Sequence, residues 1–236
     1  AHPDDETIGM GGTLKKLSKK HNVSILFVAE GITARRKSGY ATIPQYDVDH
    51  DEMKKMKKEI IVRKNHAKKA LSILGIKKMR FLDLPNQELD QIPLLKITKE
   101  IESEISNTKA NVIFTHHFND LNLDHRIVYE ATITASRPIP GSTVTSIVSF
   151  EIPASTDWRK PYQFNPNLYI DISKELEYKV KALEAYNYEI RKPPHPRSKA
   201  ITKAIANRWG SLSGYNAAEA FEIIMTRVND ISKLSL

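Results

Sequence analysis

The first six residues, Ala1-His2-Pro3-Asp4-Asp5-Glu6, contain one imidazole and two adjacent aspartates before any helix-forming pattern begins. An imidazole nitrogen and a carboxylate oxygen together suit Zn²⁺ or a similar divalent ion. We therefore expect His2 and Asp5 to be metal ligands. Asp4 lies between them and is placed to act as a base beside the metal. This cluster predicts an enzyme.

A second group of such side chains occupies residues 115–125, which hold three histidines and two aspartates. The group follows a β-rich run, and in parallel sheets the active site lies beyond the carboxyl ends of the strands. His125 is the best candidate for a third metal ligand. Asp124 is placed to orient His125 or a neighbouring ligand as a carboxylate that does not itself contact the metal. Asp120 is expected to cap a turn.

A His/Asp/His set with an open position is typical of a catalytic metal rather than a structural one. Such a metal lowers the pKa of bound water toward ~7, and Asp4 can take the proton. The hydroxide would attack a carbonyl whose developing oxyanion the metal stabilises. This chemistry fits hydrolysis of an amide or an ester.

The elements that must position these residues alternate along the chain. This alternation predicts an α/β domain over residues 1–236, with a mostly parallel central sheet and helices on both faces in three layers. Because a metal-binding turn usually follows a strand, we expect a short strand before Ala1. Residues 30–51 read as a long loop, Ser173 as a helix N-cap, and the form of 217–228 stays open. Strands are expected over 23–29, 79–84, 111–115, 143–150 and 168–172, and helices over 9–20, 52–74, 93–106, 173–186 and after residue 198.

Composition limits the function classes. Apolar residues make up 40% and charged residues 27%, which indicates a globular chain. The absence of cysteine excludes disulfides and thiolate metal sites and fits a cytoplasmic location. The longest apolar runs are too short to cross a bilayer. The net charge of +8 leaves a basic module for nucleic acid or another anionic polymer as an alternative. Without a nucleic-acid-binding motif, the lysine runs favour solvated helix faces and no nucleic-acid partner.

The opening motif, paired with the later Asp124-His125, resembles the PIG-L (LmbE-like) family of metal-dependent N-deacetylases. Residues 151–158, 164–167, 194–198 and 218–221 are similar to blocks of one bacterial branch. The resemblance implies a Rossmann-like fold and zinc as cofactor, although the ligand set also tolerates Fe²⁺ or Co²⁺. It further implies removal of acetyl groups from N-acetylglucosamine-type sugars. By position, the resemblance implies that His2, Asp5 and His125 hold the metal and that Asp4 is the general base.

One departure concerns the general acid. Many family members have histidine two residues before the Asp-His pair, where this chain has Asn122. Asparagine can donate a hydrogen bond to an oxyanion but cannot shuttle a proton. The acid is then Asp4, returning its proton, or His195, whose flanking prolines fix its backbone. A rigid surface loop is an equal alternative for His195.

Other residues are candidates for substrate binding. Arg197 is suited to a phosphate or carboxylate of the substrate, as are Arg35 and Arg36 in the long loop, although single arginines are more often simply exposed. Trp158 and Tyr162 would form a sugar-stacking wall or pack locally.

The sequence predicts a small-molecule or glycoconjugate substrate and is compatible with a homo-oligomer. A metal-dependent amidase acting on a thiol conjugate or another non-sugar amide stays open beside the sugar deacetylase.

Overall fold

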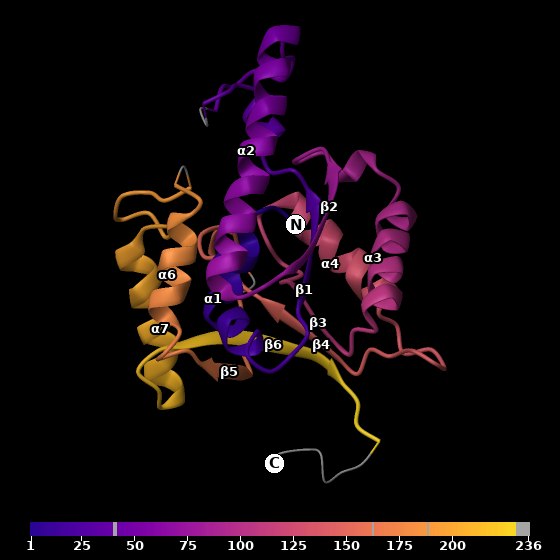
Figure 1. Cartoon of the computed structure of the whole chain (residues 1–236), viewed down its shortest axis with the longest axis vertical. Helices are drawn as coiled ribbons and strands as arrows, with labels where there is room; N and C mark the ends of the chain where they lie inside the picture. Colours follow the sequence, from indigo (N-terminus) through magenta and orange to yellow (C-terminus); the bar gives the residue numbers. More distant parts are fainter. Residues whose placement is uncertain (40–41, 162, 188, 230–236) are drawn as a thin grey trace.

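A computed structural model describes residues 1–39, 42–161, 163–187 and 189–229 of the chain. Figure 1 shows a central layer of strands with helices on both of its sides. The strands are β1 (Ser24–Ala29), β2 (Lys78–Leu84), β3 (Val112–His116), β4 (Ser146–Phe150), β5 (Leu168–Asp171) and β6 (Ala218–Thr226). The helices are α1 (Asp5–Leu17), α2 (His50–Leu74), α3 (Leu94–Thr108), α4 (Leu123–Ala135), α5 (Ser155–Trp158), α6 (Leu176–Glu184) and α7 (Lys199–Ser213), with 3-10 turns η1 (Thr33–Arg35) and η2 (Leu89–Gln91).

The strands pair in two groups. β1 pairs with β2 in parallel, and the second group has the order β3-β4-β6-β5. β3 and β4 are parallel, whereas β6 runs antiparallel to both β4 and β5. The α/β class and the parallel β1–β2 and β3–β4 pairs are therefore as expected. The terminal segment, whose form the sequence left open, is the strand that makes the layer mixed.

The two larger apolar clusters hold the layers together. On one face, α1, α2 and α6 pack on the strands through residues such as Leu14, Leu71 and Ala182. On the other face, α3 and α4 pack against β1 through Ile97 and Val128. Burial of such side chains is the main force that fixes α1 and α4, whose first turns carry the chemistry, against the sheet.

A cavity of about 430 Å³ lies between β1 and β3. Within the described residues, β1 forms its ladder only with β2 and β3 only with β4, so two parallel strand edges face this cavity. The carbonyl of Ala1 lies at its end and accepts hydrogen bonds from the backbone N–H groups of Val28 and Ala29. A strand before Ala1 stays a prediction.

Most predicted elements are confirmed within a few residues, with two instructive differences. α1 begins at Asp5 instead of residue 9, because Asp5 and Glu6 lie in its first turn, where acidic side chains favour the helix dipole. Ser173 does not cap α6: its hydroxyl donates to Asp171 at 2.5 Å, and the helix begins three residues later. The glycine at position 12 allows close packing, since a Cβ there would lie 2.8 Å from Ile172.

The lysines of α2 at positions 54, 55, 57 and 58 are exposed, in agreement with a solvated helix face. No helix in the described ranges has the length and apolar character needed to cross a membrane.

Candidate metal centre and active site

The opening motif forms the turn that enters α1. Asp5 closes this turn, because its carboxylate accepts a hydrogen bond from the N–H of His2 at 2.7 Å and its own N–H donates to the carbonyl of His2. Asp4 has a φ of 135°, which L-residues rarely adopt. Such strain is of order 1–3 kcal/mol and clusters at functional sites. The consequence is that two consecutive carboxylates meet different partners.

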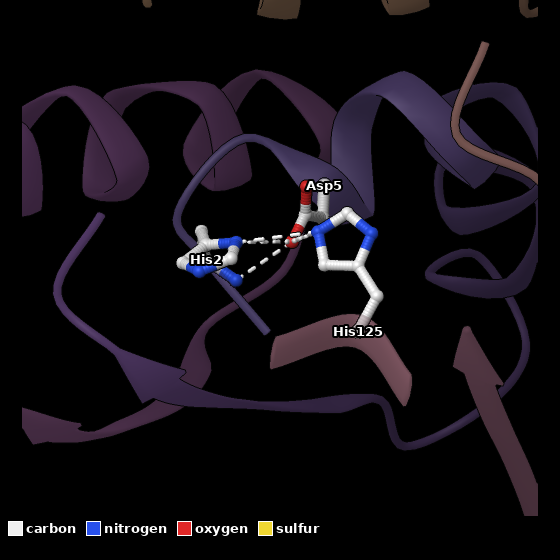
Figure 2. A group of neighbouring side chains, drawn as sticks. All are labelled: His2, Asp5 and His125. Carbon is white, nitrogen blue, oxygen red and sulfur yellow. Dashed lines mark hydrogen bonds and ion pairs between the residues drawn. The ribbon is translucent and has the colours of Figure 1, made fainter. Parts of the chain in front are cut away.

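Three predicted ligands meet at one point. Asp5 Oδ2 lies 3.3 Å from His2 Nδ1 and 3.3 Å from His125 Nε2, and the two nitrogens are also 3.3 Å apart. Figure 2 shows the Asp5 carboxylate between the two imidazole rings. A tetrahedral ion with bonds of ~2.0–2.1 Å requires ligand atoms about 3.3–3.4 Å apart. The triangle therefore matches one face of such a tetrahedron, and these residues form a possible metal site.

Each histidine of this triad has a carboxylate behind its other nitrogen. Asp124 Oδ2 lies 2.8 Å from His2 Nε2, and Asp120 Oδ1 lies 3.2 Å from His125 Nδ1. Carboxylates in these positions fix the tautomer and orientation of metal-binding imidazoles. Asp124 lies beside His2, and its role in orienting this imidazole stays a prediction. Asp120 caps its turn as expected, by accepting from Asn122 N–H at 2.8 Å, but it also orients His125.

The electrostatics of the triad favour a cation. Burial alone would lower the pKa of His125, but Asp5 and Asp120 outweigh it and raise this pKa to about 9. Burial would raise the pKa of Asp5, yet the charge of His125 and hydrogen bonds from His125 and His2 hold it well below its usual range. A proton on His125 thus occupies a place where positive charge is strongly stabilised. A metal ion would displace that proton on binding.

Asp4 faces a different environment from Asp5. Its side chain is buried, and Oδ2 lies 3.0 Å from Arg63 Nη2 and 3.3 Å from Arg197 Nη1. Burial raises the pKa of Asp4, while the two guanidinium groups oppose that rise. Asp4 is therefore held beside the triad by arginines and is not part of the triad itself.

The arginines predicted to bind substrate separate into two places. Arg35 and Arg197 both contact Glu189 beside Asp4. Arg36 instead pairs with Glu88. The side chain of Arg197 is 26% exposed, so one guanidinium of this group is open to a ligand. A substrate-binding role for the three arginines stays a prediction.

Asn122 is placed as a helix cap. Its Oδ1 accepts a hydrogen bond from Asp124 N–H at 2.9 Å at the start of α4. The cap fixes the first turn that carries Asp124 and His125. A direct catalytic role for Asn122 stays a prediction, and this bond leaves its amide NH₂ as the group available to an oxyanion.

His195 lies in the proline-rich loop next to the arginines. Its Nδ1 accepts a hydrogen bond from Arg197 N–H at 3.0 Å, which assigns the proton of the neutral ring to Nε2. Burial lowers the pKa of His195, and Arg197 and Arg191 add to the effect. The ring packs edge-on to Trp158, which is 59% exposed. Tyr162, the other expected wall residue, lies outside the described residues.

Sequence reasoning missed Arg63, Glu189 and His116. Arg63 had a usable signal: it falls on the buried stripe of α2 formed by Met56, Ala67 and other apolar residues, where a charged side chain needs a partner. His116 ends β3, and its ring stacks on His125 at 4.0 Å between centroids.

Glu6 has a structural role beside the opening turn. Its carboxylate accepts from Asp4 N–H at 3.0 Å and from the Tyr186 hydroxyl at 2.8 Å. Burial raises the pKa of Glu6 to about 7. These bonds tie the strained turn at Asp4 to the segment that follows α6.

Comparison with known proteins places this site in a family. Residues 1–136 match the model of the PIG-L family, described as GlcNAc-PI de-N-acetylase. The chain is 24% identical over 238 residues to diacetylchitobiose deacetylase of Thermococcus kodakarensis, covering 94% of this chain and 80% of the relative.

Among solved structures, N,N'-diacetylchitobiose deacetylase from Pyrococcus horikoshii superposes with a TM-score of 0.73 at 20% identity, covering 95% of this chain and 81% of that one. GalB, the 4-carboxy-2-hydroxymuconate hydratase of Pseudomonas putida KT2440, superposes with a TM-score of 0.71 at 15% identity, covering 98% and 95%. The fold is thus shared by a deacetylase and a hydratase, and fold alone does not select the reaction. The match of the family model over more than half of the chain does identify the family: this protein belongs to the PIG-L family of de-N-acetylases.

Proposed function

We propose that this protein is a metal-dependent hydrolase that removes the acetyl group from an N-acetylated amino sugar. The observation that carries the proposal is the equilateral triangle of His2, Asp5 and His125 donors, with a separate carboxylate, Asp4, beside it. The family match and the names of the deacetylase relatives support the reaction class. Zn²⁺ is the proposed ion, with Fe²⁺ or Co²⁺ compatible with the same donors.

A divalent ion held by the triad would polarise the acetyl carbonyl and lower the pKa of water. The rest of the work falls to this chain's own residues. Asp4 Oδ2 lies 3.0 Å from Arg63 Nη2 and 3.3 Å from Arg197 Nη1, so we assign proton transfer to Oδ1. Asp4 takes the proton of the attacking water and then gives it to the amine nitrogen as the C–N bond breaks. The products are acetate and the free amino sugar.

His195 has a different role in this scheme. Because its pKa is lowered, the ring is neutral near pH 7 and donates a hydrogen bond from Nε2. We therefore assign the return of the proton to Asp4 and leave His195 as a donor to the substrate or its oxyanion. Trp158, edge-on to His195 and exposed, offers a face for the sugar ring.

The test is acetate release from N-acetylglucosamine, N,N'-diacetylchitobiose and N-acetylcysteine conjugates, with metal content measured on the same protein. We expect release from the sugars, one ion per chain, and a loss of about 10²–10⁴-fold in kcat for Asp4→Asn. Release from thiol conjugates alone would establish the non-sugar amidase instead. A protein that binds no metal and hydrolyses none of these amides would refute the proposal.

A further inference from the structure

Glu189 is a buried carboxylate on which three arginines from different segments converge. Its Oε1 contacts Arg35 from η1 and lies 2.9 Å from Arg63 Nη1 of α2. Its Oε2 lies 3.0 Å from Arg197 Nη1, which belongs to the loop before α7. Only 5% of the Glu189 side chain is exposed. The residue itself lies in the loop between α6 and α7 that also carries Arg197, so three distant segments meet at one carboxylate.

Two of these arginines continue to Asp4. Arg63 uses Nη1 for Glu189 and Nη2 for Asp4, so its planar guanidinium bridges the two carboxylates. Arg197 contacts both carboxylates through Nη1. Each carboxylate is thus held by the same pair of arginines, and no contact between Glu189 and the metal triad is needed for Glu189 to influence Asp4.

We propose that Glu189 is a positioning residue that holds Arg63 and Arg197 in the orientation in which both contact Oδ2 of Asp4. This inference rests on the proposed function only in that Asp4 is taken as the general base. By holding Oδ2, the arginines leave Oδ1 to meet the proton of the attacking water. Glu189 does not touch substrate in this scheme.

The physical reason lies in the charge of the cluster. Three guanidinium groups surround two carboxylates, and Arg63 is almost fully buried. A buried cation that loses one of its two anions remains uncompensated, and the remaining anion is drawn toward it. Without the charge of Glu189, Arg63 is free to take both oxygens of Asp4 in a bidentate pair. Asp4 would then present no free oxygen to the water.

The state of Glu189 fits this role. Burial would raise its pKa, but Arg63, Arg35 and Arg197 outweigh burial and lower the pKa to about 2. Glu189 is therefore ionised throughout the neutral range, and its influence on the arginines does not vary there.

A purely structural role of Glu189, in which it only links segments of the fold, predicts different effects of substitution from a positioning role. Loss of a structural tie lowers thermal stability and acts on kcat independently of Asp4. Loss of positioning lowers kcat with little change in KM, because the interaction is realised in the transition state and not in substrate binding. Positioning through Asp4 also requires that the effect disappear once Asp4 itself is removed.

The experiment compares Glu189→Gln with Glu184→Gln on an acetamide that the wild type hydrolyses. Glu184 lies at the end of α6, is 42% exposed and pairs with Lys199 at the surface, so it is a matched loss of charge. We expect kcat of Glu189→Gln to fall about 10–100-fold, as for a misplaced catalytic group, with KM and metal content within threefold of wild type. Glu184→Gln should match the wild type. In an Asp4→Asn background, Glu189→Gln should change the residual kcat less than about twofold.

Three outcomes would overturn the proposal: an unchanged kcat for Glu189→Gln, an equal loss in Glu184→Gln, or a full additional loss in the Asp4→Asn background. If Glu189→Gln does not fold, a crystal structure of the metal-loaded wild type tests the proposal instead. The proposal is overturned if that structure places Arg63 or Arg197 beyond hydrogen-bond distance from Asp4. If the wild type hydrolyses no acetamide, the proposed function fails separately. Crystal structures of wild type and Glu189→Gln then test the inference alone, and an unmoved Asp4 carboxylate contradicts it.

Discussion

Replacement of Asp124 by asparagine tests how the metal site is held. Asp124 Oδ2 accepts from Gln87 N–H at 2.7 Å and lies 2.8 Å from His2 Nε2, while Oδ1 accepts from Leu89 N–H at 3.3 Å. Burial would raise the pKa of Asp124, but the bonds from His2 and the two amides lower it, so the carboxylate is ionised near neutral pH. An asparagine has one oxygen for these three donors. Either orientation of its amide sets an NH₂ group against a donor.

The magnitude follows from the least unfavourable orientation. If the asparagine oxygen replaces Oδ2, His2 and Gln87 keep acceptors, and the long bond from Leu89 is lost. One buried donor then costs about 1–3 kcal/mol of stability. His2 also exchanges a charged acceptor for a neutral one, which is roughly half as strong. We expect the affinity for Zn²⁺ to fall about 10–100-fold, or about 1.4–2.7 kcal/mol.

Isothermal titration calorimetry in competition with a chelator measures that affinity for wild type, Asp124→Asn and the control Asp90→Asn. Asp90 is exposed and lies close to Leu89 in the chain, so its substitution removes the same charge without touching His2. Zn²⁺ affinity of Asp124→Asn within twofold of wild type would refute the reasoning. An equal loss in Asp90→Asn would show that the net charge of the region, not the bond to His2, governs the affinity.

Three further predictions concern stability. Burial raises the pKa of Glu151 to about 7, so between pH 4.5 and 7 the folded protein holds a proton that the unfolded chain has lost. As pH rises from 4.5 to 7, the melting temperature of the wild type should therefore fall relative to that of Glu151→Gln. A difference in melting temperature that stays constant over this range would contradict the prediction. Fluorescence of Trp209, which donates to Glu151 at 2.7 Å, should titrate in the same range. Gly12→Ala should destabilise the fold by about 1–3 kcal/mol in urea unfolding, because its Cβ would lie 2.8 Å from Ile172, whereas Gly12 variants as stable as wild type would refute that contact. An N-terminal extension of about six alternating valines and isoleucines should fill the cavity between β1 and β3 and raise Tm by at least about 5 °C. An extension interrupted by proline cannot pair as a strand, so the same rise in Tm from it would show that no strand forms in the cavity.

The sequence predicted the elements well where the local pattern and the final environment agree. The run at 23–29 is β-branched and apolar and became β1, and Gly75 ended α2 in the left-handed conformation typical of a C-cap. β6 is the counterexample: residues 218–226 mix alanine and glutamate with isoleucine, so local preference does not decide. Pairing with strands on both sides decides it, and that pairing is tertiary information.

Prediction of the site depended on how rare each residue type is in its context. His2, Asp5 and His125 were predicted as ligands because a fold seldom needs clusters of histidine and aspartate at strand ends for its stability, and the structure brings them together. Arg63 and Glu189 were missed because a lysine-rich helix and a polar loop hide single charged residues. Arg63 and Glu189 pair across more than a hundred residues of sequence, and no local pattern encodes such a contact.

The different surroundings of Asp4 and Asp5 are the feature of the site that local sequence encodes least. Two adjacent carboxylates in a regular helix turn would point about 100° apart and still share solvent. Here Asp4 has a positive φ, and Asp5 meets imidazoles while Asp4 meets guanidinium groups. Imidazoles can exchange their protons for a metal ion, whereas guanidinium groups cannot be deprotonated. One carboxylate is therefore placed to share a cation, and the other stays beside fixed positive charges with an oxygen available for a proton. The strained turn and the arginines that Glu189 holds are thus two parts of one arrangement, and substitution of either should affect Asp4 before it affects the metal triad.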